Sequence, residues 1–355
     1  MMSTPREDNT RAPVIASAPG RCGIIGNPTD MYGGSVLSCT IPQRGYVSIR
    51  PADRLTLESD QGVLAVRTRD DLQQRGDHFD VLRAVISQQQ CLGMKAQFTC
   101  WSDVPIGSGL SSSSSLVVAA LYALVAYQGR AMSRYFFAET ARGIELNDMG
   151  VICGYQDFYM PTFGGLNYME FRDKEFYREV HSEPYAAVES LTPLVRELPF
   201  VLAHTGVEHS ADVVHRPIRE RWLEGERHVV QAYVEIGRLA REGKKALLET
   251  DWELLGRLMN ENHAIQRDLG GSGAENEQLI QAALDNGAPG AKLAGAGDGG
   301  TIIALHPDPE YLGSQLKSAG ATRILFPRPV AGARLDSSAG ADESAVASTY
   351  AGNVE

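Results

Sequence analysis

Short runs of alternating apolar and polar residues dominate the first 190 residues and predict β-strands. Each run is rich in β-branched side chains and is bounded by glycine, proline or aspartate. Alternation of this kind is typical of a strand that buries one face against a core. The predicted strands are residues 13–20, 33–41, 45–51, 54–60, 62–68, 94–101 and 163–171.

Longer segments with helical spacing of apolar residues lie between and after these strands. Residues 116–127 are apolar on every side, which predicts a buried helix. The amphipathic helices are expected at 78–93, 133–150, 226–249, 251–269, 275–287 and 309–320. Three further strand-like runs follow residue 190, at 198–206, 290–305 and 321–327.

This mixture of elements predicts the fold class. Because strands and helices do not alternate strictly, an α+β protein is favoured over a doubly wound sheet. We expect two domains, residues 13–190 and residues 191–330. Residues 1–12 and 331–355 are small, polar and aperiodic, and we expect both ends to be disordered.

Composition and charge exclude several classes of function. The 355 residues carry a formal net charge of −11, which argues against nucleic acid or an anionic membrane as a partner. No run of apolar residues is long enough for a membrane span, and the N-terminus lacks the apolar core of a signal peptide, so we expect a cytoplasmic protein. Five cysteines without a CxxC pair predict reduced, buried thiols.

The stretch PIGSGLSSSSS, residues 105–115, is the first candidate site. A strand precedes it and the apolar helix follows it, which places residues 107–111 at a helix N-terminus. Unpaired backbone N–H groups and the helix dipole favour an anion there. Glycine allows close approach of the backbone, and serine hydroxyls can bind phosphate oxygens or Mg²⁺. We predict a phosphate-binding turn; a plain capped helix is the alternative.

This stretch resembles the phosphate motif of the GHMP kinases, a superfamily that includes galactokinase, homoserine kinase and mevalonate kinase. Two more motifs of that family occur in the family's order, APGRCGIIGNPTDMYGGSVLSCTI at 18–41 and KLAGAGDGGTIIAL at 292–305. The resemblance covers about residues 12 to 327. It implies a two-domain fold whose C-terminal domain is a ferredoxin-like α/β plait, with ATP and Mg²⁺ as cofactors.

The resemblance also implies roles for individual residues. Asp157 in GYQD corresponds to the catalytic aspartate at the acceptor hydroxyl, and Arg21 is expected beside it. Glu145 and Ser113 are the expected metal ligands, and Asp148 and Ser112 are the alternatives to them. The residues expected at the nucleotide phosphates are Pro105, Gly107, Ser108, Gly109, Leu110, Ser111, Ser112, Ser113, Ser114, Gly295 and Gly297. Those expected at the acceptor are Asn27, Asp30, Arg216 and Gly295.

The acceptor is indicated by departures from the galactokinase pattern. Galactokinases carry Glu-His where this chain has Asn27 and Pro28. An asparagine amide can donate a hydrogen bond to a carboxylate, whereas a glutamate would repel it. The GNPTD variant resembles that of the plant-type glucuronokinases, which implies conversion of D-glucuronate to its 1-phosphate. The basic stretch 209–222 could supply a guanidinium, with Arg216 as the candidate, or could simply pair with neighbouring glutamates.

Other readings of the sequence stay open. Heptose-7-phosphate kinases share a GxQD-like motif and a similar glycine-rich motif, and a galactokinase-like sugar-1-kinase fits as well. A non-catalytic sensor of sugar and nucleotide is the alternative outside enzymes. We expect a small-molecule sugar and ATP as partners, and either a monomer or a homodimer. Asp298 stands where the family usually has glycine.

Overall fold

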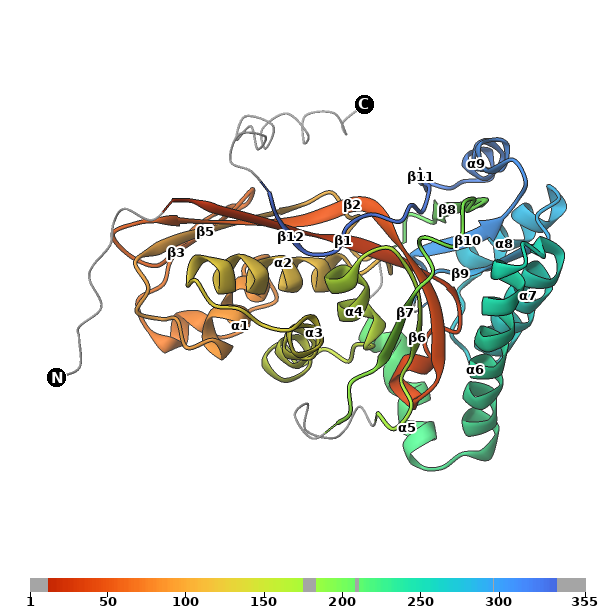
Figure 1. Cartoon of the computed structure of the whole chain (residues 1–355), viewed down its shortest axis with the longest axis horizontal. Helices are drawn as coiled ribbons and strands as arrows, with labels where there is room; N and C mark the ends of the chain where they lie inside the picture. The colour runs from red at the N-terminus through yellow and green to blue at the C-terminus, as the bar shows by residue number, and fades with distance from the viewer. Residues whose placement is uncertain (1–11, 175–182, 208–210, 296, 337–355) are drawn as a thin grey trace.

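The computed structural model describes residues 12–174, 183–207, 211–295 and 297–336. Two β-sheets, each covered by helices, lie side by side along the long axis of the molecule (Figure 1). The strands of the first sheet come almost entirely from the first 190 residues, and those of the second sheet from residues 200–325. The α+β, two-domain fold class is therefore confirmed.

The first sheet is built around two long antiparallel strands, β1 and β2. The strand order is β12-β1-β2-β5-β3-β4, and β6 and β7 extend the sheet from the first half of β2. Where the sequence predicts two strands at 33–41 and 45–51, the structure has one continuous strand. The strands are β1 (Val14–Ile25), β2 (Ser35–Pro51), β3 (Thr56–Ser59), β4 (Gly62–Ala65), β5 (Ala96–Ser102), β6 (Leu166–Glu170), β7 (Ala187–Ser190) and β12 (Arg334–Asp336).

One face of this sheet is covered by the apolar helix α2 (Ser112–Tyr127), which packs against β1 and β2. Its apolar residues contribute to the largest core of the protein, so the prediction of a buried helix is confirmed. The helix predicted at 133–150 is α3 (Arg134–Gly143) followed by a π-helical turn, η3 (Ile144–Asp148). The other helices of this domain are η1 (Thr29–Tyr32), η2 (Arg69–Leu72), α1 (Asp80–Gln88) and α4 (Gln156–Phe163).

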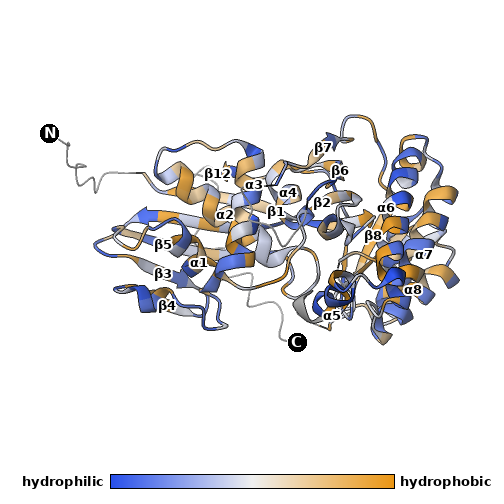
Figure 2. Ribbon diagram, turned by 90° about the horizontal axis from the view of Figure 1, so that it is seen from below, coloured by the Kyte–Doolittle hydropathy of each residue, from blue (hydrophilic) through white to orange (hydrophobic). Residues whose placement is uncertain are grey.

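The second sheet has four strands in the order β11-β8-β10-β9, and all neighbours are antiparallel. With helices between β8 and β9 and between β10 and β11, this is the order of a ferredoxin-like plait. The strands are β8 (Phe200–His204), β9 (Gly290–Leu293), β10 (Thr301–Leu305) and β11 (Arg323–Leu325). The helices are α5 (Ala211–Leu223), α6 (Arg227–Leu248), α7 (Trp252–Asp268), α8 (Ala274–Asp285) and α9 (Pro309–Ser318). Helices α6 and α7 carry both hydrophobic and hydrophilic residues (Figure 2), as expected of helices with one buried face.

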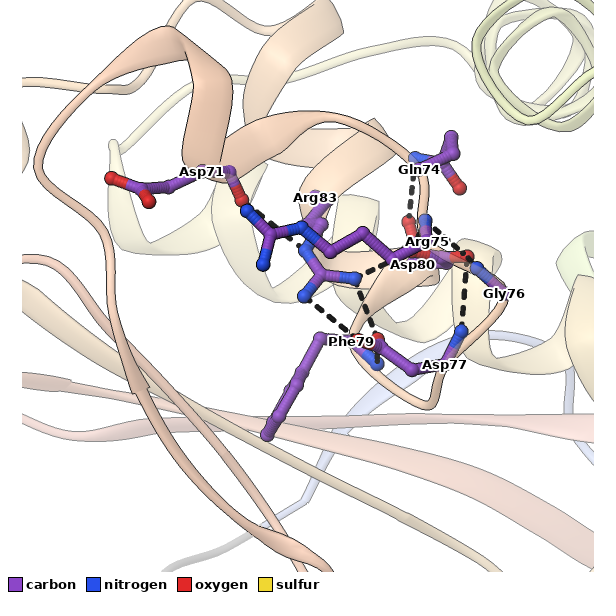
Figure 3. A network of polar contacts seen from close by, with 8 residues as sticks. All are labelled: Asp71, Gln74, Arg75, Gly76, Asp77, Phe79, Asp80 and Arg83. Carbon is purple, nitrogen blue, oxygen red and sulfur yellow. Dashed lines mark hydrogen bonds and ion pairs between the residues drawn. The ribbon is translucent and has the colours of Figure 1, made fainter.

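A polar network anchors the start of α1 (Figure 3). The Arg83 guanidinium is buried and pairs with Asp77 and Asp80, each at 2.6 Å. Asp80 also accepts hydrogen bonds from the backbone N–H groups of Arg75 and Gly76. The network therefore closes the loop that leads from η2 into α1.

The expectation of a disordered tail from residue 331 is wrong for its first residues. β12 pairs with β1 in antiparallel register, and the Ser17 hydroxyl donates a hydrogen bond to Asp336 at 2.5 Å. The buried Arg44 guanidinium donates to the carbonyl oxygens of Ala331 and Gly332, each at 2.8 Å. These two carbonyls lie on a segment with no periodicity of its own, so its order comes from contacts with the first sheet. The remaining residues expected to be disordered, 1–11 and 337–355, lie outside the described residues.

All five cysteines are free and buried, as predicted. In the parts of the chain that the structure covers, no helix combines the length and the apolar character needed to cross a bilayer.

Candidate active site

The serine stretch forms a tight turn that ends at the first residue of α2. Three of its residues, Gly107, Gly109 and Ser111, have positive φ angles of 62°, 71° and 63°. Glycine adopts this conformation at little cost, and serine adopts it against its preference. The turn therefore wraps around the N-terminus of a 16-residue helix, where backbone N–H groups are available to an anion.

The other two motifs lie directly against this turn. The backbone N–H of Arg21 donates to the Leu110 carbonyl at 3.0 Å, and that of Gly23 donates to the Ala294 carbonyl at 2.9 Å. Gly295 packs so closely on Gly109 that a Cβ atom at position 295 would clash with the Gly109 carbonyl oxygen. Three segments separated by up to 273 residues thus meet at one point between the two sheets.

Arg21 and Asp157 meet beside the serine turn. One Arg21 nitrogen donates to the Gly109 carbonyl at 2.7 Å, and the other pairs with Oδ1 of Asp157. The Ser111 hydroxyl donates to the same Oδ1 atom. Among the described residues nothing donates a hydrogen bond to Oδ2 of Asp157, and 17% of this side chain is exposed. The carboxylate is therefore held by one oxygen and presents the other.

Asp30 lies next to Asp157 but is fully buried. It accepts hydrogen bonds from the backbone N–H of Gln156 at 3.0 Å and from the Gln156 side chain at 3.2 Å. Burial, and then the nearby Asp157 charge, raise the pKa of Asp30 to about 6. A hydrogen bond from Ser38 to Gln156 at 2.8 Å extends the network into β2. Asp30 therefore anchors the beginning of α4, on which Asp157 lies.

Glu145 is the carboxylate that faces the serines. It lies in the π turn η3 and accepts a hydrogen bond from the Ser114 hydroxyl at 3.0 Å. Burial, and then the Asp157 charge, raise the pKa of Glu145 to about 7, while hydrogen bonds from Ser114 and Ser113 lower it. Asp148, the alternative metal ligand, makes no hydrogen bond to the serine turn within the described part of the chain. Glu145 and these two hydroxyls are the group that could hold a cation.

Asn27 connects the first and third motifs, and its partner is a lysine that sequence reasoning missed. The Asn27 amide donates to the Gly295 carbonyl at 3.1 Å, and its oxygen accepts from the Lys292 ammonium at 2.7 Å. Lys292 is fully buried in β9, and burial lowers its pKa to about 7. A lysine within a strand that is otherwise apolar was the signal that could have identified it.

The rest of the glycine-rich motif is shaped by a neighbouring turn. Gly297, with φ at 104°, packs against the Gly271 carbonyl. Asp298, with φ at 51°, donates its backbone N–H to that carbonyl at 3.2 Å. Asp298 therefore keeps the left-handed backbone conformation that glycine adopts easily.

The basic stretch forms part of α5. Arg221 pairs with Glu226 at 2.7 Å, so one arginine of this stretch pairs with a neighbouring glutamate, as the alternative to a substrate-binding role expects. Arg216 is exposed, whereas Arg219 is half-buried. Burial raises the pKa of Tyr32 to about 12, the charge of Asp30 adds to this rise, and the charge of Arg219 opposes it. His215 and Pro28 line one small cavity between α5, α6 and α7. Helix α5 thus approaches the GNPTD loop, residues 26–30. His209 lies outside the described residues.

Sequence profiles of known families match three parts of this chain. The N-terminal domain of GHMP kinases matches residues 79–165, and their C-terminal domain matches residues 244–321. The galactose-binding signature of galactokinases matches residues 6–51. These ranges contain the serine turn, the glycine-rich motif and the GNPTD loop.

Individual relatives cover most of the chain. Probable glucuronokinase 2 of Arabidopsis thaliana is 29% identical over 81% of this chain and 83% of its own length. A mevalonate kinase of Thermococcus onnurineus is 26% identical over 88% and 95%. A D-glycero-alpha-D-manno-heptose 7-phosphate kinase of Campylobacter jejuni is 31% identical over 57% and 59%. The crystal structure of Lactococcus lactis galactokinase shares the fold, with a TM-score of 0.72, 19% identity, and coverage of 92% and 95%.

Proposed function

This chain belongs to the GHMP kinase family and is a sugar kinase, and we propose that it phosphorylates the anomeric hydroxyl of D-glucuronate with ATP. The observation that carries this proposal is the position of Asp157 between Arg21 and the serine turn. A carboxylate beside a phosphate-binding turn is what transfer of a phosphoryl group to a hydroxyl requires.

The proposed reaction uses the two oxygens of Asp157 differently. Oδ1 is occupied by Arg21 and Ser111, which orient the carboxylate. Oδ2 would accept the proton of the acceptor hydroxyl while the oxygen of that hydroxyl forms a bond to the terminal phosphorus of ATP. The bond between that phosphorus and the bridging oxygen of ADP breaks at the same time, and ADP leaves with the electron pair. Arg21 would also hold the transferring group by its positive charge.

The nucleotide phosphates would lie on the N–H groups of residues 107–114, under Gly295. The residues fit a magnesium ion, because a buried carboxylate with two serine hydroxyls forms a small, hard oxygen donor set. Glu145 with Ser113 or Ser114 would hold it, and when bound it would neutralise phosphate charge. Among the described residues, no group of three or more histidine, cysteine or acidic side chains is placed to hold a metal.

The choice of acceptor depends on the residues around the GNPTD loop. The Asn27 amide is 1% exposed and already holds Lys292 and Gly295, so we propose that it shapes the site more than it binds the sugar. Asp30 would similarly act mainly by fixing Gln156 and the start of α4. For the uronate carboxylate, the charge of Arg219 near Tyr32 supports this residue over the exposed Arg216.

A heptose 7-phosphate is the second candidate acceptor. It is supported by the Campylobacter jejuni relative, whose match covers 59% of that protein. A guanidinium on α5 would suit the phosphate of such a sugar as well as it suits a carboxylate. Galactose, which has no anionic group, would gain nothing from this guanidinium.

A panel of acceptors tests the proposal. We expect ADP release in equal amount to sugar 1-phosphate with D-glucuronate, and at least about tenfold lower kcat/KM with galactose, since a charged hydrogen bond contributes about 1.5–3 kcal/mol. D-glucuronate should also be preferred over heptose 7-phosphate. Preference for heptose 7-phosphate or galactose would overturn the acceptor assignment. Binding of ATP and sugar without turnover would favour the sensor.

Two single variants locate the anion contact. Arg219→Ala should raise KM for D-glucuronate about tenfold and leave galactose kinetics unchanged, whereas Arg216→Ala, the matched change one turn away, should have a smaller effect. The opposite ranking would return the role to Arg216.

A further inference from the structure

Lys292 is a buried cation without a buried anion to balance it. Its ammonium donates to two neutral oxygens, the Asn27 side chain at 2.7 Å and the Leu293 carbonyl. Within the described residues, no carboxylate forms an ion pair with it. An ammonium removed from water without a counter-charge is unfavourable unless an anion approaches.

The groups around Lys292 do not supply that anion. On β1, the Arg21 guanidinium opposes its charge and the Cys22 thiol lies beside it. Burial raises the pKa of Cys22 to about 12, so this thiol is neutral near pH 8. On α7, His263 faces Lys292 and already shares its nitrogen with Glu277 of α8 at 2.9 Å. The strand β10 contributes the neutral Ile303 as cross-strand neighbour.

A short chain of contacts connects Lys292 to the phosphate-binding turn. The ammonium binds the Asn27 oxygen, and the Asn27 amide binds the Gly295 carbonyl at 3.1 Å. Gly295 in turn lies on Gly109 of the serine turn. In a buried setting, charges separated by two such contacts are screened much less than at the surface.

We propose that Lys292 is a positioning residue that holds Asn27 and Gly295 in place and balances the phosphate charge of the bound nucleotide from beneath the glycine-rich motif. Nucleotide binding and protonation of Lys292 then favour each other. The serine turn has no lysine of its own, and Lys292 supplies that charge from β9. This inference rests on the proposed nucleotide site.

Linkage gives the sign of the effect. Because burial lowers the pKa of Lys292 to about 7, the free protein has largely lost this proton at pH 8. The unfolded chain keeps it up to pH 10.5, so the penalty for burying Lys292 falls and the free fold becomes more stable as pH rises from 7 to 10.5. Bound phosphate raises the pKa of Lys292, so nucleotide affinity falls over the first part of that range. Opposite pH trends in stability and affinity are not expected of a lysine with only a packing role.

The experiment is calorimetric titration of the full chain with ADP between pH 7.5 and 9, in EDTA and in two buffers of different ionisation enthalpy. For the wild type we expect proton uptake and affinity that falls about threefold to tenfold. Lys292→Gln keeps a hydrogen-bond donor without the charge, and Lys292→Met removes both. Both variants should bind ADP more weakly at pH 7.5 and with nearly constant affinity up to pH 9. Glu145 is common to all three proteins, so it cancels in the comparison.

The outcomes of this titration distinguish the role of Lys292 from the proposed function. If the wild type binds ADP without proton uptake beyond that of the variants, the role of Lys292 is overturned while the proposed function stands. If proton uptake appears only on adding D-glucuronate, the balancing anion is the acceptor and the nucleotide assignment is overturned. If ADP does not bind the wild type at all, the proposed function itself fails. Should both variants fail to fold, Glu145→Gln takes the place of the wild type so that this carboxyl cannot take up the proton. Proton uptake on ADP binding at pH 8 then still supports the inference, and its absence contradicts it.

Discussion

At the scale of single residues, the site depends on which oxygen of a carboxylate is occupied. Asp157 is held through Oδ1 by Arg21 and Ser111, while Asp30 and Glu145 are buried with hydrogen bonds to Gln156 and Ser114. Three carboxylates in one region thus have different surroundings. Only Asp157 combines a fixed orientation with an accessible oxygen, which is the geometry that a general base needs.

Asp157→Asn tests this assignment. An amide in place of the carboxylate keeps the shape of the side chain but cannot take a proton, so we expect kcat to fall by about 10²–10⁴-fold with less than about threefold change in sugar KM. Steady-state kinetics with D-glucuronate measures both values. Asp148→Asn, on the π turn, is the control and should leave kcat within about twofold. A normal kcat in Asp157→Asn would remove Asp157 from the mechanism.

At the scale of elements, the protein places its chemistry where regular structure begins or breaks. Asp157 lies in the first turn of α4, and the serines open α2. Glu145 lies in a π turn rather than in the α-helix that precedes it. Such turns frequently occur at functional sites because the extra residue reorients a side chain.

The network at the start of α1 makes a prediction about stability (Figure 3). Arg83→Ala leaves Asp77 and Asp80 without their cation, and we expect the free energy of unfolding to fall by about 2–4 kcal/mol, below the full value for a buried pair because Asp77 is partly exposed. Urea denaturation measures the loss. Arg75→Ala removes an exposed side chain and keeps its backbone N–H bond to Asp80, so it should change stability by less than about 0.5 kcal/mol. Equal losses in the two variants would contradict this role of Arg83.

At the scale of the whole molecule, the chain returns to its starting point after completing the second sheet. The backbone N–H of Arg328 donates to the Thr40 carbonyl at 3.1 Å, and the isolated bridge between Gly164 and Ala331 continues the contact. β12 then pairs with β1 at the edge of the first sheet. The first domain is therefore completed by residues beyond 327.

Truncation tests the contribution of this segment. A chain that ends at Pro329 loses β12 and leaves the buried Arg44 without the Ala331 and Gly332 carbonyls. Since hydrogen bonds to a charged group contribute about 1.5–3 kcal/mol each, we expect Tm to fall by about 5 °C or more. The matched chain that ends at Asp336 keeps these contacts and should change Tm by less than about 1 °C. Similar Tm values for the two chains would show that β12 is dispensable.

The sequence by itself determined the local features of this protein. Periodicity identified most of the helices and strands, and glycines beside a serine run predicted the tight turn at the start of α2, because these signals lie within a few residues of one another. The tertiary structure decided the rest. The hydrogen bonds to Oδ1 of Asp157, the contact of Glu145 with Ser114, the Lys292–Asn27 contact and the pairing of β12 join residues far apart in the chain. Such contacts depend on how the two sheets bring distant segments together, and no local pattern encodes that arrangement.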